Sequence, residues 1–168
     1  GTSQAPATQV EPQPKPTTPS KKEASPRTAR EKALAVYATK LLQAYYLIPP
    51  NATEVSMRNA VKRAVPAISP RFFERLYFGV EETRRPQNQL RWEDQLTLRA
   101  AIHSDQLVIT SETGLRRIVS VPVTVRALTP EGEEEFSVDL DTTSTWRYND
   151  GTWMLMGLSD HAEGGDGI

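Results

Sequence analysis

The spacing of the apolar residues changes once along this chain, near Pro86, and that change limits the folds open to it. Before Pro86 the apolar side chains recur every three to four residues, as in Leu34, Ala38 and Leu41, which is typical of helices. After Pro86 they alternate with polar residues, most clearly from Phe136 to Tyr148, which is typical of strands. Helices followed by a series of strands indicate an α+β fold with the helices packed on one face of an antiparallel sheet.

Three helices are predicted in the first half of the chain. Each begins at a Thr or Ser that can cap its N-terminus and ends at a proline, which has no backbone N–H to continue a helix. The expected ranges are 28–48, 53–65 and 69–85. The third helix carries Phe72, Leu76 and Val80 on a stripe that we expect to pack on the sheet. Phe73 and Tyr77 lie on an adjacent stripe, which either widens this buried face or faces a groove or a partner.

The second half of the chain predicts four or five antiparallel strands in a meander. Alternation of apolar and polar residues marks them at 96–102, 107–109, 119–127, 136–148 and from 153 onward. The sequence "NDG" before the last strand is a strong hairpin signal, because Gly151 accepts the positive φ of a two-residue turn. With this turn Tyr148 lies opposite Trp153, and Trp146 lies opposite Leu155. The sheet then has one apolar face, which the helices cover.

The chain is expected to hold one folded domain between two loose ends. Residues 1–26 contain six prolines and no aromatic residue, so we expect a disordered linker over 1–27, a domain over 28–160 and a flexible tail over 161–168. The chain starts at Gly1 and "GTS" resembles a tag-cleavage scar or a domain boundary, so we expect a piece of a longer protein. No run approaches the ~20 apolar residues of a membrane span, so any anchor is expected upstream of Gly1.

The sequence offers little catalytic chemistry. The chain has no cysteine, and its two histidines, His103 and His161, are far apart, so no cofactor or metal site is predicted. The formal net charge of −1 gives no reason to expect nucleic acid as a partner. An enzyme or small-ligand binder would need a cavity of roughly 300 Å³ or more with a buried carboxylate. Asp94 and Tyr148 are the candidate residues for that alternative.

A set of aromatic residues separates the alternatives. An enzyme keeps the space between sheet and helices open, whereas a scaffold can fill it with side chains. Three tryptophans lie in the short β region, and they favour the filled interior: Trp92, Trp146 and Trp153.

Residues 45–118 carry a series of short motifs that resemble one family. A helix with Asn59 is followed by "SPRFFERL", in which Ser69, Pro70, Phe73 and Leu76 match an S-P-x-x-[FY]-x-x-L pattern, and later by the strand "VITSETGLRRIVSV". The series is similar to the periplasmic domains of VirB-eight-like and TraE-like assembly factors of type IV secretion and conjugation systems. The resemblance covers roughly residues 32–158 and implies a nuclear-transport-factor-two-like (NTF2-like) cone: three helices on a curved sheet of four or five antiparallel strands.

This resemblance also implies a function. The chain would be the non-catalytic, extracytoplasmic domain of a protein with a single-pass anchor in the inner membrane. It would associate weakly with itself and dock onto other channel components, with the Pro-rich segment as a spacer. Exposed aromatic residues contribute disproportionately at interfaces, and two basic residues lie in the last turn of the predicted third helix. The residues expected to contact partners are therefore Tyr45, Tyr46, Phe73, Tyr77, Arg84 and Arg85.

Overall fold

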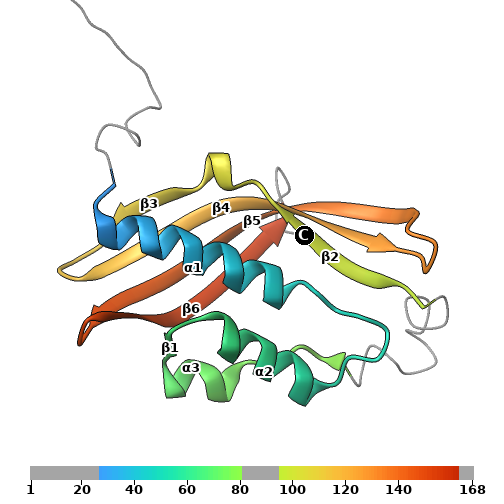
Figure 1. The fold of residues 1–168 in the computed structure, drawn as a ribbon, viewed down its shortest axis with the longest axis horizontal. Coiled ribbons are helices and arrows are strands. Elements are labelled where there is room, and N and C mark those ends of the chain that lie inside the picture. Colours follow the sequence, from blue (N-terminus) through green and yellow to red (C-terminus); the bar gives the residue numbers. More distant parts are fainter. Residues whose placement is uncertain (1–26, 81–94, 163–168) are drawn as a thin grey trace, which may run out of the picture.

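The computed structural model describes residues 27–80 and 95–162. In chain order its elements are α1 (Ala29–Tyr45), α2 (Glu54–Ala64), β1 (Ala67–Ile68), α3 (Pro70–Arg75), β2 (Thr97–Ile102), the 3₁₀ turn η4 (Ser104–Gln106), β3 (Val108–Ser111), β4 (Arg116–Leu128), β5 (Glu134–Asn149) and β6 (Thr152–Ala162). Figure 1 shows α1 lying across the curved sheet, with α2 and α3 beside β1. The predicted α+β cone with helices before strands is confirmed.

The first two helices begin where their capping residues predict. The Thr28 hydroxyl accepts a hydrogen bond from the Glu31 backbone, and the Glu31 carboxylate accepts one from the Thr28 backbone, which completes a capping box. Thr53 and Ser56 make the corresponding pair at α2. Both boxes satisfy backbone N–H groups that have no partner inside a helix, so these N-termini are specified locally.

The third helix is much shorter than predicted. It begins at Pro70 after the Ser69 cap, as expected, but it ends at Arg75, so the predicted helix over 69–85 is wrong at residues 76–79. Residues 81–85 of the prediction lie outside the described residues. Leu76 has an extended backbone and Gly79 has a φ of 68°, which a continuous helix does not contain. Side chains of α2 take over the backbone hydrogen bonds of this segment, as described below for the site.

The strands form a six-stranded sheet in the order β1-β6-β5-β4-β2, with β3 also paired to β4. All neighbours are antiparallel except the two-residue β1, which lies parallel to β6. The predicted meander holds from β3 to β6, but β2 and β3 share one edge of β4 end to end. Pro122 of β4 lies opposite the break between them, where its missing N–H costs no ladder bond.

The hairpin between β5 and β6 has the predicted register. Asp150 and Gly151 have positive φ angles of 52° and 80°, and Tyr148 pairs with Trp153 as expected. Their rings meet edge to face with centroids 5.0 Å apart. Trp146 pairs with Leu155, and a bulge follows on β6 between this pair and the pair of Thr145 with Gly157. This bulge changes which side chains of β6 face the helices.

The core lies between α1 and the concave face of the sheet. Its largest side chain is Trp146, which is completely buried and donates from its indole N–H to the Ser144 hydroxyl at 2.8 Å. Trp153, 4% exposed, donates to the Arg30 carbonyl of α1 at 3.0 Å. An ion pair between Glu31 and Arg117, 3.0 Å long, ties the start of α1 to β4. Two of the three tryptophans therefore fill the cone; Trp92 lies outside the described residues.

Candidate functional site

A hollow lined by aromatic, aliphatic and acidic side chains lies at the C-terminal end of α1. It has a volume of about 270 Å³, and we refer to it as the aromatic hollow. Its lining residues come from α1, from the two segments on either side of α2, and from the far end of the sheet: Tyr45, Tyr46, Ile48, Tyr77, Phe78, Leu98, Val125, Val138, Leu140 and Asp160. Most of this lining is apolar, and Asp160 is its one ionised side chain.

Three aromatic rings pack against one another beside this hollow. The rings of Tyr45 and Tyr46 meet edge to face with centroids 4.9 Å apart, and the Phe78 ring lies 5.0 Å from Tyr45. Tyr46 is 7% exposed and belongs to the core, whereas Tyr77 is 60% exposed. The structure thus gathers Tyr45, Tyr46 and Tyr77, three of the predicted contact residues, at one place.

Asp160 on β6 is held by the end of α1. The Tyr46 hydroxyl donates a hydrogen bond to its carboxylate. Burial, this hydrogen bond and the negative charge of Asp160 together raise the pKa of Tyr46 well above its ordinary value. Burial first, and then the charge of Asp160, raise the pKa of Tyr45 as well. Both phenols therefore remain neutral throughout the physiological pH range.

The segment after α3 that carries Tyr77 and Phe78 is held by α2. The Glu54 carboxylate accepts from the backbone N–H groups of Phe78 at 2.6 Å and Val80 at 3.3 Å. Arg58 donates to the Leu76 carbonyl. These bonds take the place of helical ones, so the chain leaves α3 and turns back along α2. A helix continuing to residue 85, as predicted, would leave no such wall for the hollow.

Phe73 lies apart from the other predicted contact residues. The guanidinium of Arg58 lies 4.3 Å from the centre of its ring, and the Lys62 ammonium lies 5.3 Å from it. Phe73 is half-buried and packs on the main core. Arg84 and Arg85 lie outside the described residues. A role in partner contact stays a prediction for all six residues.

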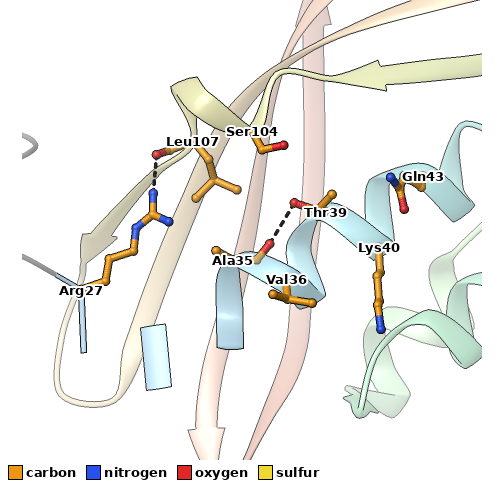
Figure 2. Close-up of a pocket in the computed structure, with 8 residues that line it drawn as sticks. All are labelled: Arg27, Ala35, Val36, Thr39, Lys40, Gln43, Ser104 and Leu107. Carbon is orange, nitrogen blue, oxygen red and sulfur yellow. Dashed lines mark hydrogen bonds between the residues drawn. The ribbon is translucent and has the colours of Figure 1, made fainter. Parts of the chain in front are cut away.

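A second hollow, the α1 groove, lies between α1 and the η4 turn (Figure 2). It has a volume of about 360 Å³ and is lined by Arg27, Ala35, Val36, Thr39, Lys40, Gln43, Ser104 and Leu107. Figure 2 shows Arg27 reaching across to the Leu107 carbonyl, to which it donates at 2.8 Å. Val36 is half exposed along this groove. None of the lining residues is acidic, so the groove contains no carboxylate.

The structure describes one of the two residues proposed for the enzyme alternative, Tyr148. Tyr148 lines neither hollow; its ring meets that of Trp153 edge to face, and the Arg30 guanidinium lies 4.1 Å from its ring centre. Asp94 lies outside the described residues. Among residues 27–80 and 95–162 no group of three or more His, Cys, Asp or Glu side chains is placed to hold a metal ion.

Sequence reasoning missed Asp160. Simple alternation from Trp153 and Leu155 onward would place residues 157 and 159 on the concave face and Asp160 on the convex one. The bulge adds one residue to β6, so that Leu158 and Asp160 face the helices instead. The signal available in the sequence was the small Gly157 directly after Met156, where strands often bulge.

Comparison with known proteins finds similarity in structure but not in sequence. No family model matches the sequence. No curated protein matches it. An IcmL-like type IV secretion system protein from Legionella pneumophila aligns with a TM-score of 0.56 at 11% identity, over 80% of this chain and 94% of that one.

Two further solved structures align with lower scores. CagV, a VirB8 homologue of the type IV secretion system of Helicobacter pylori, has a TM-score of 0.49 at 12% identity, over 77% of this chain and 98% of that one. A Xanthomonas campestris protein, assigned as a calcium/calmodulin dependent protein kinase II association domain, has a TM-score of 0.43 at 13% identity. The alignment covers 83% of this chain and 90% of that one. Of the three, the first alone exceeds 0.5. The chain thus shares its fold with a type IV secretion system protein, as the resemblance predicted.

Within the described residues no helix is both long and apolar enough to cross a membrane.

Proposed function

We propose that this chain is the non-catalytic, extracytoplasmic scaffold domain of a membrane-anchored type IV secretion or conjugation component. It acts by associating with itself and by docking onto other subunits of the channel. The observation that carries the proposal is the fold shared with the IcmL-like type IV secretion system protein, which extends over 94% of that chain. The VirB-eight-like motifs of residues 45–118 agree with it.

The filled interior supports a scaffold over an enzyme. Trp146 and Trp153 occupy the space between α1 and the sheet, where a cone-shaped enzyme keeps its cavity. Neither of the two hollows has both a volume of roughly 300 Å³ or more and a buried carboxylate in its lining. The α1 groove has the volume but no acid, and the aromatic hollow has an acid, Asp160, that is exposed.

Exposed apolar side chains support a docking role. Three of them gather around the aromatic hollow and the sheet beside it: Tyr77, Phe136 and Val138, which are 60%, 46% and 41% exposed. Phe136 and Val138 share the concave face with the core residues of β5 but lie beyond the cover of the helices. Apolar surface of this kind, next to aromatic residues, is typical of protein contact sites.

The first experiment is made on the full-length protein in its native cell. Membranes are fractionated, and protease access to this domain is tested in intact cells and in spheroplasts. We expect the domain to be bound to membranes and cleaved only after the outer barrier is opened. A soluble cytoplasmic protein would contradict the proposal and would favour a small-ligand binder of the same fold.

A second experiment tests the predicted contact residues. Alanine variants of Tyr45, Phe73 and Tyr77 are compared with wild type by sedimentation and by crosslinking to channel subunits in cells. The exposed Val55 of α2 gives a matched control, because it is 66% exposed and lines neither hollow. Folded variants that associate and crosslink as wild type does would show that these residues are not the contacts.

A further inference from the structure

We propose that the aromatic hollow binds a basic side chain, arginine above all, from a partner protein. The side chain lies against the aromatic rings and its charge meets the Asp160 carboxylate. The inference deepens the proposed docking function and rests on it for the identity of the partner as a protein. The chemistry of the hollow itself rests on the residues that line it.

The rings of the hollow suit a cation. Tyr45, Tyr46, Tyr77 and Phe78 bring four aromatic side chains to a space of about 270 Å³, which has room for one long side chain. The faces of aromatic rings attract cations, and guanidinium groups also stack on them. Leu98, Val125 and Leu140 of the sheet complete the lining and can contact the methylene stem of the side chain.

The carboxylate of Asp160 supplies the opposite charge. Its one hydrogen-bond donor among the described side chains is the neutral Tyr46 hydroxyl, which orients the carboxylate without cancelling its charge. No Lys or Arg of the described residues lies within 4.0 Å of it, although the same structure pairs Glu31, Glu112 and Glu134 with arginines. Although Asp160 is exposed, its carboxylate lies beside aromatic rings, where an incoming cation can form a charge-assisted hydrogen bond with it.

The surface around the hollow also favours a basic partner. Residues 126–141, which form the hairpin end of β4 and β5, contain six acidic residues and one basic residue. The basic residue, Arg126, is paired with Glu134 at 3.3 Å. This net negative rim attracts positive segments and repels negative ones at a distance, although two of its acids, Asp139 and Asp141, face the other side of the sheet from the hollow. The exposed Phe136 and Val138 beside this rim can hold apolar neighbours of the basic residue.

The test uses two short peptides as probes. Both are acetylated and amidated pentapeptides of the form Val-Thr-X-Thr-Val, with arginine at X in one and its neutral isostere citrulline in the other. Each is titrated into the 15N-labelled 168-residue chain. We expect the arginine peptide to shift the amide signals of Tyr45, Tyr46 and Asp160 in a saturable way. The affinity of the citrulline peptide should be lower by a factor of about ten or more, because citrulline lacks the positive charge.

Paired variants locate the site. Asp160→Asn removes the charge but keeps the shape, and it should weaken the arginine peptide about as much as citrulline does. Asp141→Asn is the matched control. Asp141 is next to Thr142, the residue of β5 that pairs with Asp160, and it faces the opposite side of the sheet. Its carboxylate lies 3.7 Å from the His161 ring nitrogen. It removes the same charge and should leave binding unchanged. Tyr45→Leu tests the ring and should weaken the arginine peptide more than the citrulline one.

Three results would overturn the inference. Equal affinity for the arginine and citrulline peptides would show that charge is not recognised. Equal weakening by Asp160→Asn and Asp141→Asn would show a general attraction to the acidic hairpin. A change in the sedimentation of the protein alone in Asp160→Asn would show that the hollow contacts a second copy of the chain. The localisation experiment above does not depend on these outcomes. The proposed function and the arginine site can therefore each be contradicted without contradicting the other.

Discussion

The two halves of the concave face have the same sequence pattern and different surroundings. On β5 the alternation runs unbroken from Phe136 to Tyr148, yet Trp146 is completely buried and Phe136 is 46% exposed. Trp146 packs in one core with Leu34, Leu41 and Leu42 of α1, whereas Figure 1 shows that the hairpin end of β4 and β5 (orange) extends beyond α1. Alternation therefore decides which face a side chain takes, and the reach of the helix decides whether that face becomes core.

The difference also separates stability from binding. The covered half contains the tryptophans and holds the fold together, whereas the uncovered half places apolar and acidic groups where another molecule can reach them. We expect substitutions in the first half to reduce stability and substitutions in the second to leave it nearly unchanged. The following variants test this division.

The largest loss is expected for Trp146→Ala. The change removes the largest buried side chain and leaves the Ser144 hydroxyl without its donor, so the free energy of unfolding should fall by about 3–5 kcal/mol. Urea unfolding followed by circular dichroism measures it. A loss below about 1 kcal/mol would mean that the covered half is not the stabilising core.

The next largest loss is expected for Glu54→Ala. It leaves the backbone N–H groups of Phe78 and Val80 without their acceptor, and the free energy of unfolding should fall by about 1–3 kcal/mol. Glu74→Ala, on the exposed side of α3, is the control and should change it by about 0.5 kcal/mol or less. Equal effects of the two variants would show that Glu54 does not hold the wall of the aromatic hollow.

A smaller, pH-dependent effect is expected at Tyr46. The pKa of Tyr46 is raised in the folded state. Below pH 10 the phenol is protonated in both the folded and the unfolded chain, so the raised pKa does not change the free energy of unfolding there. Above pH 10 the unfolded chain ionises and the folded one does not, so wild type should lose about 1 kcal/mol between pH 10 and pH 11 from this group.

Tyr46→Phe removes that alkaline loss. Urea unfolding at several pH values should show the gap between wild type and Tyr46→Phe narrowing above pH 10. Tyr37→Phe, which removes a phenol elsewhere on α1, serves as the control. Parallel curves for wild type and Tyr46→Phe would contradict the raised pKa of Tyr46, which burial causes first and the Asp160 carboxylate second.

The smallest effect is expected for Phe136→Ala. Phe136 is on the same strand and the same face as Trp146 but lies beyond the helices, so the free energy of unfolding should change by about 0.5 kcal/mol or less. The same urea experiment measures it beside Trp146→Ala. A loss comparable to that of Trp146→Ala would show that the uncovered half is part of the core.

Local sequence rules predicted much of this fold because their causes lie within a few residues. The caps at Thr28 and Thr53 act on neighbouring backbone groups, and the Asp150–Gly151 turn imposes the pairing of Tyr148 with Trp153. The length of α3 could not be predicted in this way. Its end depends on Glu54 and Arg58 of α2, which lie 18 to 26 residues away from their backbone partners.

The candidate site was predicted only in part, for a similar reason. Tyr45, Tyr46 and Tyr77 were chosen as surplus aromatic residues, and the structure places all three around one hollow. Asp160 was missed because one extra residue in β6 reverses the face that it takes. Phe73 and Tyr77 are four residues apart and were assigned to one stripe of the predicted helix. In the structure the Phe73 ring lies against Arg58 and Lys62 and does not line the aromatic hollow.

The order of elements, the helix starts, the hairpin register and the apolar face can all be read from the chain, since periodicity, capping and turn geometry act between near neighbours. Contacts between distant segments set the rest: the early end of α3, the depth at which each aromatic residue lies, and the meeting of Tyr46 with Asp160 across 114 residues. Such contacts depend on how far α1 reaches over the curved sheet and where β6 bulges, and no short stretch of sequence contains that information.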